Sequence, residues 1–89
     1  MSIEKQKYFI IHNNNLKYTA NTLDEAIKIV EEKIDKIVNY YQKELGDSVY
    51  NILVNIETDN KDEIKYNITG HYKFISIEIN TVFETFKII

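Results

Sequence analysis

The chain has 89 residues, enough for one domain, and its 44% hydrophobic and 28% charged residues are ordinary for a globular protein. This composition speaks against a disordered or fibrous chain. The chain has no Cys, which excludes disulfides, thiolate nucleophiles and cysteine-based metal sites. The net charge of -3 and the absence of Arg argue against a nucleic-acid-binding surface, because such binding is largely electrostatic.

The first apolar run, residues 8–11, is too short for the core of a signal peptide or for a membrane span. We therefore expect a cytoplasmic protein. Ile, Asn and Lys are abundant while Pro and Trp are absent, as is typical of AT-rich genomes. The composition suggests a low-GC bacterium, its phage or another mobile element as the source.

The N-terminal segment predicts a hairpin. Residues 5–12 favour a strand that is apolar on both faces and therefore central in its sheet. Asn13-Asn14-Asn15 is a turn signal, since Asn tolerates the left-handed backbone region. Residues 16–19 then predict a short returning strand that leads the chain into a helix.

The most regular segment is 22–45, where apolar residues recur at steps of three and four, as on one face of a helix. Thr22 with Glu25 three residues later forms a capping box, and Gly46 can end the helix in the left-handed conformation. At 1.5 Å per residue this helix would be about 34 Å long. It is long enough to cross a whole sheet.

Alternating apolar and polar residues predict three strands after the helix, over 48–58, 63–69 and 72–79. We expect Gly70-His71 to be a two-residue turn, which would set Tyr66 opposite Ile75 and Ile64 opposite Ile77.

The connection at Asp59 to Asp62 is expected to act as a three- or five-residue loop. Such a loop would set Ile56 opposite Ile64 and Val54 opposite Tyr66.

The last segment, 81–89, fits two structures. Its β-branched and aromatic residues favour a final strand, with Asn80-Thr81 as the preceding turn and Phe86 opposite Ile75. A capping box formed by Thr81 and Glu84 would instead start a helix. The strand is favoured because so short a helix is only marginally stable by itself.

These elements predict a single two-layer α+β domain over residues 1–89. Its antiparallel sheet would have five or six strands, with one long helix on one face and the chain order β-β-α-β-β-β(-β).

Catalytic and metal-binding patterns are weak, so we expect neither an enzyme nor a cofactor. No Gly-x-Ser-x-Gly elbow surrounds a Ser, and the acidic turn 59–63 lacks the ligand spacing of a calcium loop. His12 and His71 could share a metal with a carboxylate such as Asp47. Two separate histidines at hairpin turns are the favoured alternative.

Exposed apolar residues are the remaining functional signal. Leu53, Tyr72 and Phe74 are expected on the sheet face away from the helix. A border of the helix stripe carries a second candidate set, Ile29, Lys33, Lys36 and Tyr40. A contiguous aromatic patch would mark a protein interface.

We therefore predict a small non-enzymatic protein-binding module, such as a phage or mobile-element inhibitor that sterically occupies a host complex. One alternative is a nucleic-acid-binding domain, in which Tyr72 and Phe74 stack on bases beside Lys65 and Lys73. Another is a homo-oligomeric structural protein, a homodimer whose sheet faces or edges meet.

Overall fold

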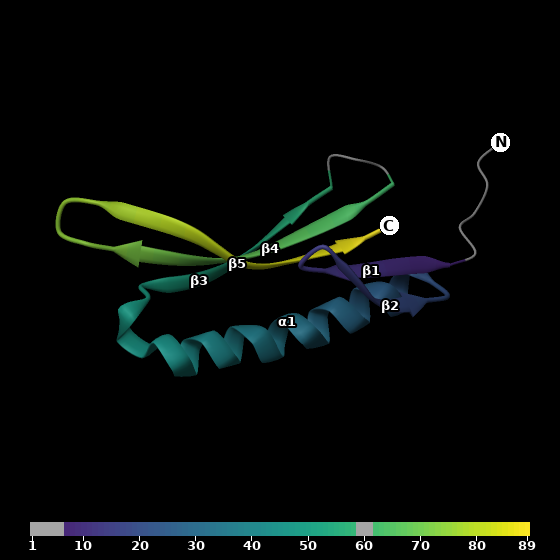
Figure 1. Cartoon of the computed structure of the whole chain (residues 1–89), viewed down its shortest axis with the longest axis horizontal. Helices are drawn as coiled ribbons and strands as arrows, with labels where there is room; N and C mark the ends of the chain where they lie inside the picture. The colour runs from purple at the N-terminus through teal and green to yellow at the C-terminus, as the bar shows by residue number, and fades with distance from the viewer. Residues whose placement is uncertain (1–6, 59–61) are drawn as a thin grey trace.

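The computed structural model describes residues 7–58 and 62–89 of the chain. In chain order its elements are β1 (Tyr8–His12), β2 (Asn15–Ala20), α1 (Leu23–Leu45), the short 3-10 helix η1 (Gly46–Ser48), β3 (Asn51–Glu57), β4 (Ile64–Lys73) and β5 (Glu78–Ile88). The strands form one five-stranded antiparallel sheet in the order β2-β1-β5-β4-β3, and α1 lies along one face of it (Figure 1). The predicted α+β fold is confirmed.

Both ends of α1 follow the local sequence. The Thr22 Oγ1 atom accepts a hydrogen bond from the Glu25 backbone N–H at 3.1 Å, and the Glu25 carboxylate accepts one from the Asn21 N–H at 3.1 Å. At the other end Gly46 has φ 51° and donates its N–H to the Gln42 carbonyl. The helix therefore ends because a glycine can adopt a backbone conformation that other residues avoid.

The core lies between α1 and the middle of the sheet. It consists of Ile10, Ala20, Ala26, Val30, Ile34, Tyr66, Ile68, Phe86 and Ile88, all buried. Burying each large apolar side chain contributes about 1.5–3 kcal/mol, so this cluster is the main source of stability. None of the helices in the described ranges is long and apolar enough to cross a membrane.

The turn predicted at Gly70-His71 is wrong, because β4 continues through both residues. Gly70 is instead a site of close packing: a Cβ atom there would lie 2.1 Å from the ring of Phe83. The chain reverses at Ile75-Ser76, where the Phe74 N–H donates to the Ile77 carbonyl at 2.8 Å.

The strand favoured for 81–89 is confirmed as part of the longer β5. The expected turn at Asn80-Thr81 is wrong, since both residues lie inside that strand. Consequently Phe86 pairs with Tyr66 of β4 and with His12 of β1, and not with Ile75. The stronger turn-forming residues, Gly70 and Asn80, lie on either side of the real turn, which contains only Ser76 of that kind.

β3 pairs with β4 two residues away from the predicted register. Ile56 is opposite Tyr66 and Val54 is opposite Ile68, where Ile64 and Tyr66 were expected. An even shift keeps each side chain on its predicted face. The loop prediction for residues 59–62 falls largely on 59–61, which lie outside the described residues.

Two β-bulges change the alternation of side chains. One lies between Ile10 and Ile11 in the pairing of β1 with β2. The other lies in β5, where Ile68 is opposite Glu84 but the next residue, Thr69, is opposite Val82. The extra residue is Phe83, so Phe83 and Glu84 both turn toward α1 although they are consecutive.

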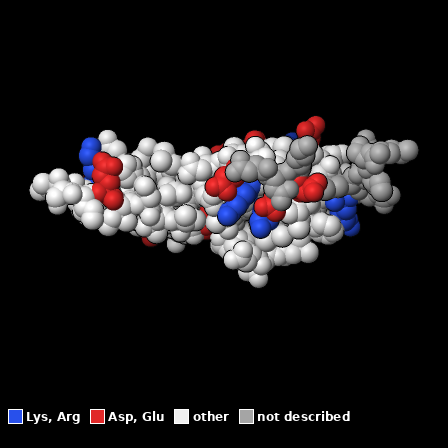
Figure 2. Space-filling view, turned by 90° about the horizontal axis from the view of Figure 1, so that it is seen from above, with Lys and Arg blue, Asp and Glu red and all other residues white. Residues whose placement is uncertain are grey.

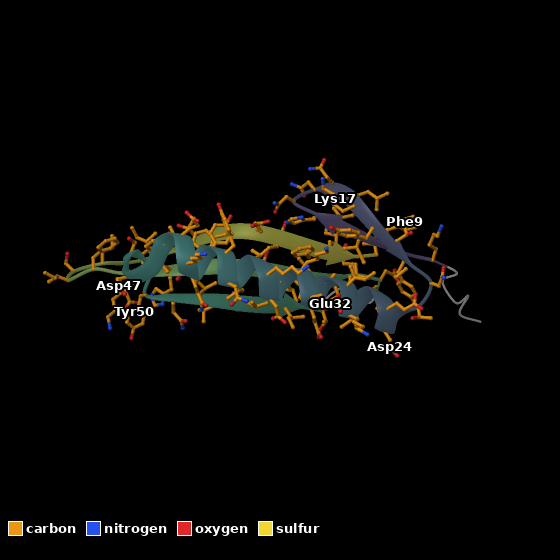
Figure 3. All side chains as sticks on the ribbon, turned by 90° about the horizontal axis from the view of Figure 1, so that it is seen from below. Phe9, Lys17, Asp24, Glu32, Asp47 and Tyr50 are labelled. Atoms are coloured by element: carbon orange, nitrogen blue, oxygen red, sulfur yellow. The ribbon has the colours of Figure 1, made fainter. Side chains whose placement is uncertain are left out.

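The molecule is elongated, with extents of 54 × 24 × 19 Å. Much of this length comes from the distal part of the β4–β5 hairpin, residues 71–81, which we call the arm. Figure 1 shows that the arm continues beyond the C-terminal end of α1. In Figure 3, seen from the helix side, Asp47 and Tyr50 mark the base of the arm, whereas Phe9 and Lys17 lie in the β1–β2 hairpin toward the opposite end.

Candidate protein-binding surface

The arm is apolar on one of its two faces. Tyr72 is the cross-strand partner of Ile79, and Phe74 and Ile77 close the turn in the same register. Cross-strand partners in an antiparallel ladder project to the same side, and so do residues two apart. These four side chains therefore form one continuous surface, which we call the arm face.

The arm face lies on the same side of the sheet as α1. The ring of Tyr72 is 6.4 Å from that of Phe83, and Phe83 stacks on Tyr41 of α1 at 4.5 Å. Tyr72 is half-buried by these neighbours. Beyond it α1 has ended, and no described residue covers the rest: Phe74 is 54% exposed, Ile77 55% and Ile79 43%.

The opposite face of the arm is polar. Lys73 is the cross-strand partner of Glu78, and His71 Nε2 lies 3.5 Å from a Glu78 carboxylate oxygen. The ammonium group of Lys73 lies 5.3 Å from the centre of the Tyr50 ring. Figure 2 shows this face, where most charged groups gather away from the arm and a blue and a red group lie side by side near its tip.

The prediction that Tyr72 and Phe74 lie on the face away from the helix is therefore wrong. The chain reverses between Phe74 and Ile77, so the two apolar sets that were assigned to opposite faces meet on the same one. The expected stacking platform is also not assembled, because Lys73 and Lys65 lie on the other face from Tyr72.

The other predicted interface residues lie elsewhere. On α1, Ile29 is half-buried and packs against the core, and the Lys33 ammonium lies 5.2 Å from the centre of the Tyr18 ring on β2. Lys36 is exposed, as is Tyr40, which makes an edge contact with the ring of Tyr41. This border therefore faces the β2 side of the sheet.

Leu53 is 40% exposed and lies on the outer face of β3. The predicted residues are therefore brought to three separate places: the arm, the helix border and β3. Ile77 and Ile79 were expected to face the core, so sequence reasoning missed them as surface residues. The opposite charges of Lys73 and Glu78 on either side of Ile75-Ser76 are a signal that could have indicated the true turn.

A polar cluster beneath the sheet was also missed. Glu84, on the same face of β5 as Phe86, lies 2.5 Å from His12 Nε2 and accepts a longer contact from the Asn13 amide at 3.4 Å. The His12 ring stacks on Phe86 at 4.3 Å. Burial raises the pKa of Tyr41, and the negative charge and hydrogen bond of Glu84 raise it further.

This cluster joins three elements. Asn13, with a positive φ of 50°, exchanges backbone bonds with β5: its N–H donates to the Thr85 carbonyl at 2.9 Å, and its side-chain oxygen accepts from the Thr85 N–H at 2.9 Å. Together with the contacts of Glu84, these bonds tie the β1–β2 turn to the centre of the sheet. These contacts give the cluster a structural role, which is to hold the β1–β2 turn against β5.

The two histidines do not meet. His12 is opposite Phe86, whose partner on β4 is Tyr66, and His71 lies five residues further along β4, or about 17 Å. Each has its own carboxylate neighbour, Glu84 for His12 and Glu78 for His71. Within residues 7–58 and 62–89, no group of three or more His, Cys, Asp or Glu side chains is placed to hold a metal ion.

Comparison of the chain with protein-family models, with curated proteins and with solved structures gave no significant match.

Proposed function

We propose that this chain is a small non-enzymatic module that binds another protein through the arm face. The observation that supports this proposal is the exposure of Phe74, Ile77 and Ile79 on one side of a projecting hairpin. Single exposed apolar residues are common, but a contiguous set on a projecting element is typical of an interaction site.

The shape of the arm favours a partner with an apolar groove. Its narrow hairpin presents Phe74 and Ile77 close to the tip and Tyr72 and Ile79 nearer the base. Ile75 at the tip is fully exposed, at 108% of its reference area. Burying a Phe or Ile side chain contributes about 1.5–3 kcal/mol, so these residues could supply the central contacts of an interface.

Occupation of a groove on a host complex would make the module a steric inhibitor. This finer proposal, together with a cytoplasmic location and a phage or mobile-element source, rests on the size and composition of the chain. The proposal that the arm face binds a protein does not depend on this finer proposal, since a protein can be bound without being inhibited.

The proposal can be tested with a photo-crosslinking amino acid at position 74, in lysate from a low-GC bacterium. We expect a discrete crosslinked protein, and we expect the Ile77→Ser variant to reduce its yield at least about tenfold, because a central contact is lost. The matched control places the same crosslinker at position 73, on the polar face of the arm.

Equal products from positions 73 and 74, or an unchanged product in the Ile77→Ser variant, would contradict binding through the arm face. Crosslinking to RNA or DNA, removed by nuclease and by added salt, would favour the nucleic-acid alternative.

A further inference from the structure

The outer edge of β3 carries backbone groups that point away from the sheet and pair with no other described strand. Phe9 and Ile89 exchange both backbone hydrogen bonds, at 2.9 and 3.0 Å, which fixes which residues of β5 point their N–H and C=O toward β1. Direction alternates along each strand. Ile89 and Lys87 of β5 therefore point their backbone groups toward β1, and Ile88 and Phe86 point theirs toward β4. By the same alternation Asn67 of β4 points toward β3, and its partner Asn55 points back toward β4. The backbone N–H and C=O groups of Ile52, Val54 and Ile56 are then left at the open edge.

The side chain of Asn51 supports this assignment. Its oxygen accepts the Ile52 N–H at 2.9 Å, a bond to a neighbouring residue that an N–H directed at β4 would not need. Among the described residues no strand pairs with this edge of β3. A free edge of this kind is a template for another strand.

The two edges of the sheet differ in their protection. At the β2 edge the pairing with β1 is interrupted by a bulge, and β2 carries Lys17. Bulges and lysines are common devices that prevent a strand from pairing with another chain. β3 is seven residues long, with a regular register and neither Lys nor Pro.

The sequence of β3, Asn-Ile-Leu-Val-Asn-Ile-Glu, complements itself when it is read in the opposite direction. With Val54 opposite the second copy's Val54, each Ile52 is opposite an Ile56 over the full strand. The outward-directed backbone groups of Ile52, Val54 and Ile56 then face those of the second copy. In this pairing the Ile52 N–H would exchange the Asn51 side-chain oxygen for the carbonyl of the second copy's Ile56. We infer that two copies of this chain pair through β3 in this antiparallel register.

Charge favours the same register. Glu57 is the only charged side chain in β3, and it falls opposite Asn51, whose amide can donate a hydrogen bond to a carboxylate. No like charges oppose one another. The inference therefore commits to a second copy of the chain, since the strand supplies its own complementary partner.

This pairing would also enclose apolar surface that α1 leaves open. Val54 is 40% exposed and Ile56 59%, although both lie on the side of the sheet that faces α1. A two-fold axis perpendicular to the sheet at Val54 keeps both helices on that side. The aliphatic side chains of the two β3 strands would then adjoin one another between the helices. This inference does not depend on the proposed function.

The absence of Cys from the natural chain allows a test that is specific for register. Under mild oxidation we expect a Val54→Cys variant to form a disulfide-linked dimer, because the paired Cα atoms would be about 5.5 Å apart, within the range that a disulfide spans. Ile56→Cys is the matched control. Two copies of position 56 would be about 14 Å apart, too far for a disulfide.

The double variant Ile52→Cys/Ile56→Cys should form the linked dimer again, because those positions are opposite each other in the inferred register. Equal yields from Val54→Cys and Ile56→Cys would overturn the register. Circular dichroism of the reduced variants checks that each one is folded.

The wild-type chain should have twice its monomer mass by light scattering on a sizing column. Val54→Lys would place two ammonium groups opposite each other at the axis and should raise the dissociation constant at least about tenfold. Val82→Lys, which replaces an exposed valine of the central strand β5, should leave it unchanged. A wild-type chain that is still monomeric at about 100 μM, a concentration above the dissociation constant of most specific dimers, would overturn the inference.

Discussion

The two halves of the β4–β5 ladder have similar residues but different surroundings. In the half that α1 covers, Tyr66, Ile68 and Phe86 are at most 4% exposed, whereas in the arm Phe74 and Ile77 are more than half exposed. Both halves place apolar cross-strand pairs on the side that faces the helix. The difference arises because α1 ends at Leu45, before the arm does. Alternation therefore specifies which side chains share a face, and the length of the opposing layer decides which of them are buried.

The largest effect is expected where this comparison is most direct. Phe86→Ala should lower the free energy of unfolding by about 3–5 kcal/mol, because it leaves a cavity in the core. Ile77→Ala in the arm should change it by less than about 0.5 kcal/mol. Urea unfolding followed by circular dichroism measures both. Similar losses in the two variants would show that the arm face is covered.

An intermediate effect is expected at the boundary between the two halves. Gly70→Ala places a methyl group where the ring of Phe83 lies, which should displace that ring from Tyr41 and cost about 1–3 kcal/mol. The same substitution in a Phe83→Ala background should cost much less. A double-mutant cycle of unfolding free energies measures the coupling, and additive costs would contradict the packing role assigned to Gly70.

The smallest effect concerns alkaline pH. Burial raises the pKa of Tyr66, with a further contribution from the charge of Glu31, and the pKa of Tyr41 is raised as well. Unfolded tyrosines ionise near pH 10, so the unfolded chain loses protons first. The contribution of these two tyrosines to the free energy of unfolding should be fully present below about pH 10. Above pH 10 the free energy of unfolding should fall by up to about 1.4 kcal/mol per pH unit for each tyrosine.

Tyr66→Phe removes one of these ionisations and should make the alkaline decline shallower, whereas Tyr50→Phe, at an exposed position, should not. Chemical denaturation of both variants at several pH values between about 8 and 11, on either side of the ordinary tyrosine pKa, measures how steeply the free energy of unfolding falls with pH. Parallel declines in both variants would mean that burial of Tyr66 does not control its ionisation.

Much of the fold could be predicted from local signals. The helix was predictable because Thr22, Glu25 and Gly46 determine its ends within a few residues, and its apolar stripe is regular. The strand register was less accessible. Gly is a common turn residue, so Gly70 was expected to mark a turn. The structure requires a glycine there for another reason, because a side chain would clash with the ring of Phe83, thirteen residues later. Such a contact cannot be predicted from local sequence.

The candidate surface was predictable in kind but not in position. Tyr72 and Phe74 were singled out as exposed aromatics, but their face was assigned wrongly because the reversal at Ile75-Ser76 contains neither Gly, Pro, Asn nor Asp. The contacts of Phe83 with Gly70 and Tyr41 were missed for a related reason, since the bulge that turns Phe83 toward α1 is invisible to period-two alternation. Both errors come from features that shift the phase of side chains within a strand.

The bulge next to β2 has a consequence for how large an assembly can become. A sheet with two free edges can add copies without limit, and growth of that kind leads to fibres. Here pairing through β3 would use up the one unprotected edge, and the two β2 strands left outermost carry the bulge and Lys17. Association should therefore terminate at two copies, and removal of both protective features is the change that would permit polymerisation.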